Sequence, residues 1–125
     1  MKEIKKLPDA EFDVMKVVWA NDPPVTTSII MEQLGKEKKW KAQTVISLML
    51  RLIERGFLRT EKRGKERIYF PLISKDDYLK FETSNFLKQY HNNSFLNLVN
   101  TLYDDNNLTE KDIDELLQWI KERRG

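Results

Sequence analysis

The chain has 125 residues, 34% of them charged and 40% hydrophobic, and it contains no cysteine. This composition is typical of a folded soluble protein, and it excludes disulfide bonds, cysteine nucleophiles and cysteine metal ligands. No apolar run approaches the ~20 residues that cross a bilayer, and no apolar segment follows the N-terminal lysines, so we expect a cytoplasmic protein without a signal peptide and without direct membrane binding.

Charge divides the chain into two parts, although the net charge is only +2. Residues 1–73 contain fifteen Lys and Arg against ten Asp and Glu, whereas residues 74–125 contain seven against ten. The basic excess is densest within residues 36–67, where eleven bases stand against four acids. This distribution predicts an anionic partner for the N-terminal part, and a basic surface that is merely solvated is the alternative.

The first predicted helix runs from about Pro8 to Ala20. Proline suits the first helical position, and the acids Asp9 and Glu11 lie where the helix dipole favours negative charge. Apolar residues then recur every three or four positions, as in an amphipathic helix: Phe12, Met15, Val18 and Trp19. Two prolines at positions 23 and 24 end this segment.

A short strand at Val25 and a second helix follow. Thr26 and Thr27 can cap this helix at its start. Gly35 is expected to end it, since glycine is the commonest residue directly after a helix C-terminus. Residues 36–39 are then expected to form a charged turn.

A third helix is predicted from Lys41 to Arg55, with Gly56 as its C-terminal stop. Residues 57–62 and 66–72 are two short extended segments around a turn that contains a glycine, which predicts a β-hairpin. The order helix, strand, helix, helix, hairpin is typical of a winged helix-turn-helix. We therefore expect a mainly α-helical fold with a small hairpin, in which residues 1–73 form a DNA-binding domain.

Residues 74–125 have the pattern of three further helices. Capping residues mark their starts: Ser74 with Asp77, Ser94, and Thr109 with Asp112. These helices carry more apolar side chains than about fifty residues can bury alone: Tyr78, Leu79, Phe86, Leu87, Tyr90, Phe95, Leu98, Val99, Leu102, Ile113, Leu116, Leu117 and Ile120. We expect a second copy of the chain to cover them, so this part is assigned to dimerisation. The expected dimerisation residues are Phe86, Leu87, Phe95, Leu98, Val99, Leu102, Ile113, Leu116, Leu117 and Ile120. The alternative is that these helices fold back on the first domain.

The third helix separates apolar from hydrogen-bonding side chains. At 100° per residue, one side carries Val45, Leu48, Met49, Leu52 and Ile53. The nearly opposite side carries four polar residues without an acid among them: Gln43, Thr44, Ser47 and Arg51. An ordinary solvent-facing surface mixes both signs of charge, so this face is predicted to read DNA. Gln43 can pair with adenine, and Arg51 can reach guanine or phosphate.

Basic residues on and near the hairpin are expected to hold phosphates without reading sequence: Arg59, Lys62, Arg63, Lys65 and Arg67. Lys39 and Lys41, at the N-terminus of the third helix, would add to the helix dipole when a phosphate binds there. The predicted DNA-binding set is therefore Lys41, Gln43, Thr44, Ser47, Arg51, Arg63, Lys65 and Arg67.

No residue pattern indicates an enzyme, a metal site or a bound cofactor. His91 is the only histidine, and it is expected to be solvated in an Asn-rich turn. The four glycines are too far apart to form a phosphate-binding loop.

Several stretches of the chain resemble one known family: Asp9–Trp19, Trp40–Val45, Leu50–Leu58, Tyr69–Leu72, Phe95–Val99, Leu108–Thr109 and Asp112–Leu116. They cover nearly the whole chain and are similar to the penicillinase-repressor family of the BlaI and MecI type. The resemblance implies a homodimeric repressor on palindromic operators, which controls beta-lactamase or penicillin-binding-protein genes. It also implies that the helix of residues 41–52 reads the operator and that the C-terminal helices dimerise.

The resemblance further implies how repression ends. Induction in the family follows proteolysis within the dimerisation part, triggered by a membrane-bound sensor metalloprotease. The cleaved Asn-Phe bond of well-known members corresponds to Thr101–Leu102 here, so this sequence lacks that pair. A copper-responsive branch uses a cysteine-rich tail, and the absence of cysteine argues against it.

Two other functions stay open from the sequence. A small molecule held in the dimer could release the DNA, and an apolar pocket lined by Phe86, Tyr90 and Phe95 would favour this mechanism. Alternatively, the winged helix could serve only for protein–protein contact, which acids on the third helix would have supported.

Overall fold

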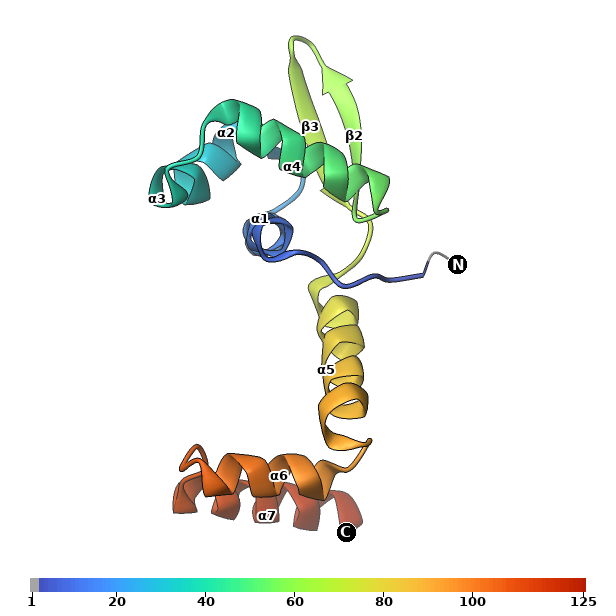
Figure 1. Ribbon diagram of the computed structural model, residues 1–125. Helices are drawn as coiled ribbons and strands as arrows, with labels where there is room; N and C mark the ends of the chain where they lie inside the picture. Colours follow the sequence, from blue (N-terminus) through green and yellow to red (C-terminus); the bar gives the residue numbers. More distant parts are fainter. Residues whose placement is uncertain (1–2) are drawn as a thin grey trace. The chain divides into compact units, whose positions relative to one another are not determined.

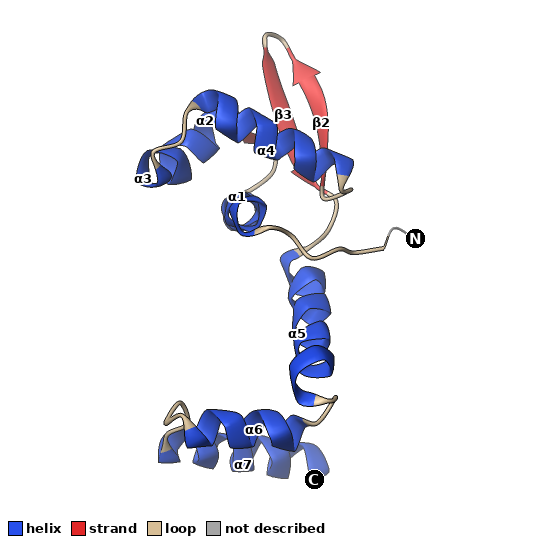
Figure 2. Cartoon of the chain, viewed as in Figure 1, coloured by secondary structure: helices blue, strands red, loops and turns tan. Residues whose placement is uncertain are grey.

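The computed structural model describes residues 3–125 (Figures 1 and 2). The chain divides into two compact units, one up to Glu82 and the other from Thr83 onward. The fold is mainly helical with one small antiparallel sheet, which confirms the predicted fold class. Within residues 3–125, no helix is both long enough and apolar enough to span a membrane.

The first unit has the predicted order of elements. They are α1 (Asp9–Ala20), β1 (Val25–Thr26), α2 (Thr27–Ile30), a π-helical turn (Met31–Gly35), α3 (Lys36–Lys38), α4 (Ala42–Glu54), β2 (Leu58–Arg63), β3 (Glu66–Pro71) and the start of α5 (Lys75–His91). The sheet has the strand order β1-β3-β2, and the hairpin register pairs Leu58 with Pro71 and Arg63 with Glu66. Gly64 has a φ of 64° in the turn, where glycine is favoured.

The second helix does not end at Gly35, and residues 36–39 are not a simple turn, contrary to expectation. Helical backbone continues through Lys38, and Lys39 takes the left-handed conformation with a φ of 59°. The Trp40 N–H donates to the Gly35 carbonyl at 2.8 Å, and the Lys39 N–H donates to the Lys36 carbonyl, which is the Schellman pattern. Gly35 instead lies close to Met31, because a Cβ built there would stand 2.8 Å from the Met31 Sδ.

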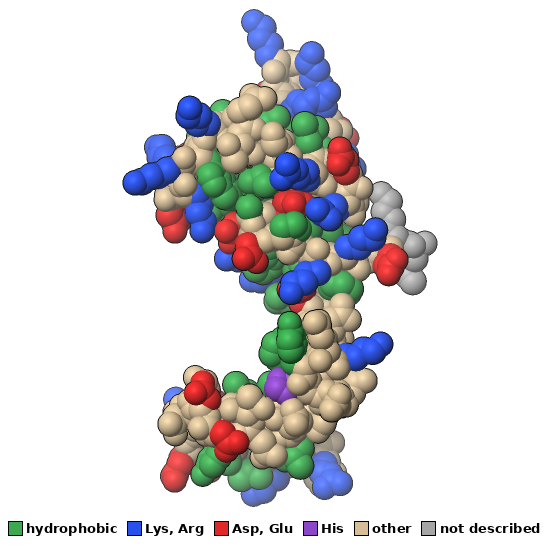
Figure 3. Space-filling model, in the orientation of Figure 1, with side chains coloured by type: hydrophobic (Ala, Val, Ile, Leu, Met, Phe, Trp, Pro, Cys, Tyr) green, Lys and Arg blue, Asp and Glu red, His purple; other side chains and the backbone are tan. Residues whose placement is uncertain are grey.

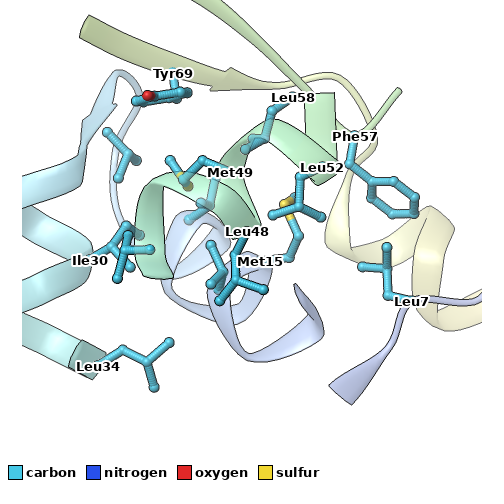
Figure 4. Close-up of a cluster of buried hydrophobic side chains, with 14 of the residues drawn as sticks. Leu7, Met15, Ile30, Leu34, Leu48, Met49, Leu52, Phe57, Leu58 and Tyr69 are labelled. Atoms are coloured by element: carbon cyan, nitrogen blue, oxygen red, sulfur yellow. The ribbon is translucent and has the colours of Figure 1, made fainter. Parts of the chain in front are cut away.

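The core of the first unit lies between α1, α4 and the sheet (Figure 4). Val14, Met15 and Val18 of α1 are buried against Val45 and other apolar side chains of α4. Each such side chain contributes about 1.5–3 kcal/mol relative to an exposed one. A charged pair accompanies this packing, since the Arg55 Nε lies 2.7 Å from the Glu11 Oε1 and Glu11 is 2% exposed.

Tyr78, at the start of α5, belongs to the core of the first unit. Its side chain is 1% exposed and packs among aromatic rings whose centroids lie 5.5–6.0 Å away: Phe12, Trp19, Phe57 and Phe81. Its hydroxyl accepts the Leu7 N–H at 2.8 Å. The expectation that a second copy of the chain covers Tyr78 is therefore wrong, because the first unit buries this side chain within the same chain.

The second unit contains the end of α5, α6 (Phe95–Asp104) and α7 (Glu110–Arg124), and the last two run in opposite directions (Figure 1). The predicted caps are confirmed. Ser94 accepts the Asn97 N–H at 3.1 Å, and Thr109 and Asp112 form a capping box. His91 is not solvated as expected, because it is 7% exposed and its Nδ1 is hydrogen-bonded to the Asn97 side chain. The Ser94 cap at the start of α6 therefore also holds Asn97 next to His91.

We predict that Tyr78→Phe destabilises the first unit by about 1 kcal/mol, because the Leu7 N–H loses a buried acceptor. The loss of stability caused by Tyr78→Phe depends on pH. Burial and the nearby Glu82 raise the pKa of Tyr78 above 10.0 in the folded protein. The hydrogen bond that the Tyr78 hydroxyl accepts from the Leu7 N–H acts in the opposite direction, but its effect on the pKa is smaller than that of burial. The stabilising contribution is therefore complete below pH 10 and declines as pH rises further, since the unfolded chain loses its proton first.

Urea unfolding of the wild type and of Tyr78→Phe at pH 7, 9 and above 10 checks this prediction. The stability difference should narrow above pH 10, and Tyr103→Phe, at an exposed tyrosine, should show no such trend. A difference that stays constant at all three pH values would contradict the pKa argument.

Candidate nucleic-acid interface

Helix α4 presents one face to the core and the other to the outside. Val45, Met49 and Leu52 are fully buried, and Leu48 is 6% exposed. The four polar residues predicted to read DNA are all exposed: Gln43, Thr44, Ser47 and Arg51. The structure therefore brings them together on one accessible surface, and their contact with DNA stays a prediction.

This outward face contains three residues that the sequence argument overlooked. Ile46 is 36% exposed and Leu50 is 54% exposed, so α4 carries apolar side chains outside the core as well. Glu54 is exposed in the last turn and lies about 60° from Arg51 around the helix. The expectation that the outward face of α4 carries no acid is therefore correct only for the turns before the last one. The helical arrangement could have identified all three, because each lies far from the buried side.

The N-terminus of α4 is open to an anion. The helix begins after Lys41, and no side chain within residues 3–125 caps its first turn. The first amide groups of a helix lack intrahelical acceptors and carry the positive end of the dipole. Lys39 and Lys41 are both exposed next to this end. A phosphate placed here would meet amide donors and positive side chains together.

The tip of the β2–β3 hairpin gathers a second group of positive side chains. Arg63, Lys65 and Arg67 are exposed, and Arg67 lies opposite Lys62 in the register. The space-filling view shows Lys and Arg side chains projecting from this tip, at the top of the molecule (Figure 3). In the described part of the chain, none of Lys41, Arg51, Arg63, Lys65 and Arg67 lies in an ion pair. Their charges are therefore available to a polyanion.

Arg59 differs from the other hairpin bases. Its guanidinium group lies 4.0 Å from the centre of the Phe70 ring and 2.6 Å from the Glu61 carboxylate. Because this charge already has a partner and a stacking surface, Arg59 is less suited to hold a phosphate than the sequence suggested.

The second unit leaves its apolar side chains incompletely covered. None of the residues of α6 and α7 is buried. Of the predicted dimerisation residues, Phe86, Phe95 and Leu117 are exposed, and seven are half-buried: Leu87, Leu98, Val99, Leu102, Ile113, Leu116 and Ile120. A hollow of about 630 Å³ opens between Phe95 and α7, lined further by Asp112, Glu115, Leu116, Trp119 and Ile120. It includes Phe95 but neither Phe86 nor Tyr90 of the pocket considered from the sequence.

The proposed cleavage position lies inside a helix. Thr101 and Leu102 are both in α6, the former exposed and the latter half-buried. The Thr101 hydroxyl donates to the Asn97 carbonyl at 3.0 Å, one turn earlier. Access to the backbone at this bond would therefore require local opening of α6.

Comparison with known proteins gives consistent relatives. The chain is 32% identical over its whole length to the penicillinase repressor of Bacillus licheniformis, covering 97% of that protein. It is 30% identical over 119 residues to the methicillin resistance regulatory protein MecI of Staphylococcus aureus (strain N315), covering 94% of this chain and 95% of MecI.

Solved structures agree with these relatives. The DNA-binding domain of the repressor BlaI is 37% identical and matches 62% of this chain and 94% of that domain, with a TM-score of 0.54. Monomeric B. licheniformis BlaI in complex with the blaP half-operator is also 37% identical, with a TM-score of 0.52 and the same coverage. The family model described as penicillinase repressor matches residues 7–122, and the chain therefore belongs to the penicillinase repressor family.

Proposed function

We propose that this protein is a transcriptional repressor that binds operator DNA with α4 in the major groove and the β2–β3 hairpin on the backbone. The observation that carries the proposal is the outward face of α4, where exposed hydrogen-bonding side chains lie between Lys41 and Arg51, neither of which is in an ion pair within residues 3–125. The solved complex of BlaI with the blaP half-operator supports this choice, because that protein is 37% identical over the matched part.

The dimensions of α4 suit this role. Its 13 residues give a length of about 20 Å, which exceeds the ~12 Å width of the major groove. The first turns can therefore reach base edges while both ends approach the phosphate strands. Gln43 can both donate a hydrogen bond to adenine and accept one from it. Thr44 and Ser47 can form hydrogen bonds to bases or to phosphate.

Positive side chains outside the groove would set the position of the protein on the duplex. Lys41 and the amide groups of the first turn of α4 meet one phosphate, whereas Arg63, Lys65 and Arg67 on the hairpin meet others. Such contacts release counterions, so affinity should fall steeply as salt rises. Direct reading of the sequence is left to α4.

A homodimer is the assembly that fits the second unit best. No apolar side chain of α6 or α7 is fully buried, and a second copy would cover Leu98, Leu116 and Leu117 among others. Two copies related by a two-fold axis would present two α4 helices to a palindromic operator.

The regulated genes are inferred from the names of the relatives, and the release mechanism is inferred from the resemblance to the family. Proteins named penicillinase repressor and methicillin resistance regulatory protein MecI match almost the whole chain, so we propose control of beta-lactam resistance genes. Proteolysis in the second unit, downstream of a membrane-bound sensor metalloprotease, would separate the two DNA-binding units. A cut between Thr101 and Leu102 would separate the last three residues of α6 and the whole of α7 from the rest of the chain, while leaving α4 intact.

Titration against a palindromic duplex from its own promoter and against a scrambled duplex tests the main proposal. We expect a dimer that binds the operator at least ~10³-fold more tightly than the scrambled duplex, with a steep salt dependence. Sedimentation of free and bound protein gives the stoichiometry in the same conditions. Equal and weak binding to both duplexes would contradict the proposal and would favour a protein–protein interaction module.

Arg51→Ala should weaken operator binding by about 1–3 kcal/mol and reduce the preference for the operator over the scrambled duplex. Lys65→Ala should instead weaken binding to both duplexes equally and lower the salt slope by about one. Arg59→Ala is the matched control, because Glu61 already pairs with this guanidinium. Unchanged operator affinity in Arg51→Ala would remove this residue from the reading face.

Leu117→Lys should convert the dimer to a monomer without unfolding the first unit, because this half-exposed side chain lies outside that core. Analytical ultracentrifugation measures the assembly, and thermal unfolding monitors the first unit. Lys111→Ala, at an exposed position of the same helix, should leave the dimer intact. A Leu117→Lys protein that still sediments as a dimer would place the interface elsewhere.

A further inference from the structure

Two apolar side chains lie on the outward face of the helix that we propose enters the DNA. Leu50 is 54% exposed and Ile46 is 36% exposed, and neither belongs to the buried core. At 100° per residue, the buried residues of α4 define the direction of the core, and Leu50 lies about 30° from the opposite direction. Leu50 is therefore near the centre of the exposed face rather than at its edge.

Their neighbours on α4 are the hydrogen-bonding residues of the proposed interface. Ser47 lies one turn before Leu50, and Gln43 lies one turn before Ile46, so polar and apolar side chains alternate over the same surface. Lys41 lies before the first turn of this surface and Arg51 lies toward its last turn, and neither is in an ion pair within residues 3–125, whereas the acid Glu54 follows at the C-terminal end. The surface thus matches a ligand that is anionic at its margins and has both polar and apolar groups between them.

The major groove of DNA offers that combination. Base edges present hydrogen-bond donors and acceptors, and the one apolar group there is the C5-methyl of thymine. We infer that Leu50 and Ile46 contact thymine methyl groups and so make the protein selective for thymine at defined positions of each half-site. This inference rests on the proposed function, because it requires α4 to lie in the groove.

The spacing of the two side chains limits how far apart the thymines can lie. Residues four apart on a helix are separated by about 6 Å along its axis, and base pairs are stacked about 3.4 Å apart. Leu50 and Ile46 therefore reach base pairs that are adjacent or separated by one pair. Gln43, on the same face, would read an adenine next to them.

Replacing thymine by deoxyuridine removes only the methyl group, and this substitution tests the inference directly. The probe is the duplex that the wild-type protein selects from a randomised pool, with each thymine replaced in turn, and fluorescence anisotropy gives the affinity. We expect the wild type to lose about four-fold per contacted methyl, which corresponds to the burial of one carbon group. Leu50→Ala and Ile46→Ala should each lose the penalty at one position and keep it at the other.

Leu72→Ala is the matched control, because Leu72 is 49% exposed but lies outside α4. This variant should keep both deoxyuridine penalties. The inference is overturned if no single replacement weakens wild-type binding, or if Leu50→Ala and Ile46→Ala retain both penalties. It is also overturned if Leu50→Ala changes the assembly state of the DNA-free protein, since Leu50 would then contact protein. Failure of the proposed function looks different, because the selected and scrambled duplexes would then bind equally well.

Discussion

The packing of α4 against α1 determines the orientation on which the proposed interface depends. A helix that turned by one residue would rotate its side chains by about 100° and exchange core residues for surface residues. Val45, Met49 and Leu52 are fully buried, so such a rotation would expose large apolar areas. The Glu11–Arg55 pair fixes the far end of α4 to α1, and a buried carboxylate strongly disfavours loss of its partner. The core therefore decides which side chains face outward.

The arrangement of the first unit could be predicted from the sequence because its signals are local and agree with one another. Period-3.6 apolar residues, the glycine at 56 and the hairpin turn each indicate the same element order. Gly35 misled the prediction, since glycine is compatible both with a helix end and with close packing against Met31. Only the side chains around it distinguish these roles.

The sequence predicts only part of the candidate site, because here too a local pattern allows more than one structural role. Polar residues of α4 were recognised, but Ile46 and Leu50 were not, because apolar residues on an amphipathic helix are usually assigned to its core. His91 was misjudged because its burial depends on Asn97, a residue six positions later whose cap position only the folded second unit reveals. Both omissions concern contacts that sequence periodicity does not report.

The division into two units gives the proposed repressor a point of control in a part of the chain other than the DNA-binding unit. If one α4 binds a half-site weakly, joining two copies raises the overall affinity by 10²–10⁴ without any new contact to DNA. In the proposed dimer that gain would depend on the second unit, because α6 and α7 have no fully buried residue and would gain stability from a partner. Tyr78 anchors the start of α5 in the first unit, so damage to α6 or α7 need not disturb α4. Loss of the dimer would therefore release the operator while each DNA-binding unit stays folded.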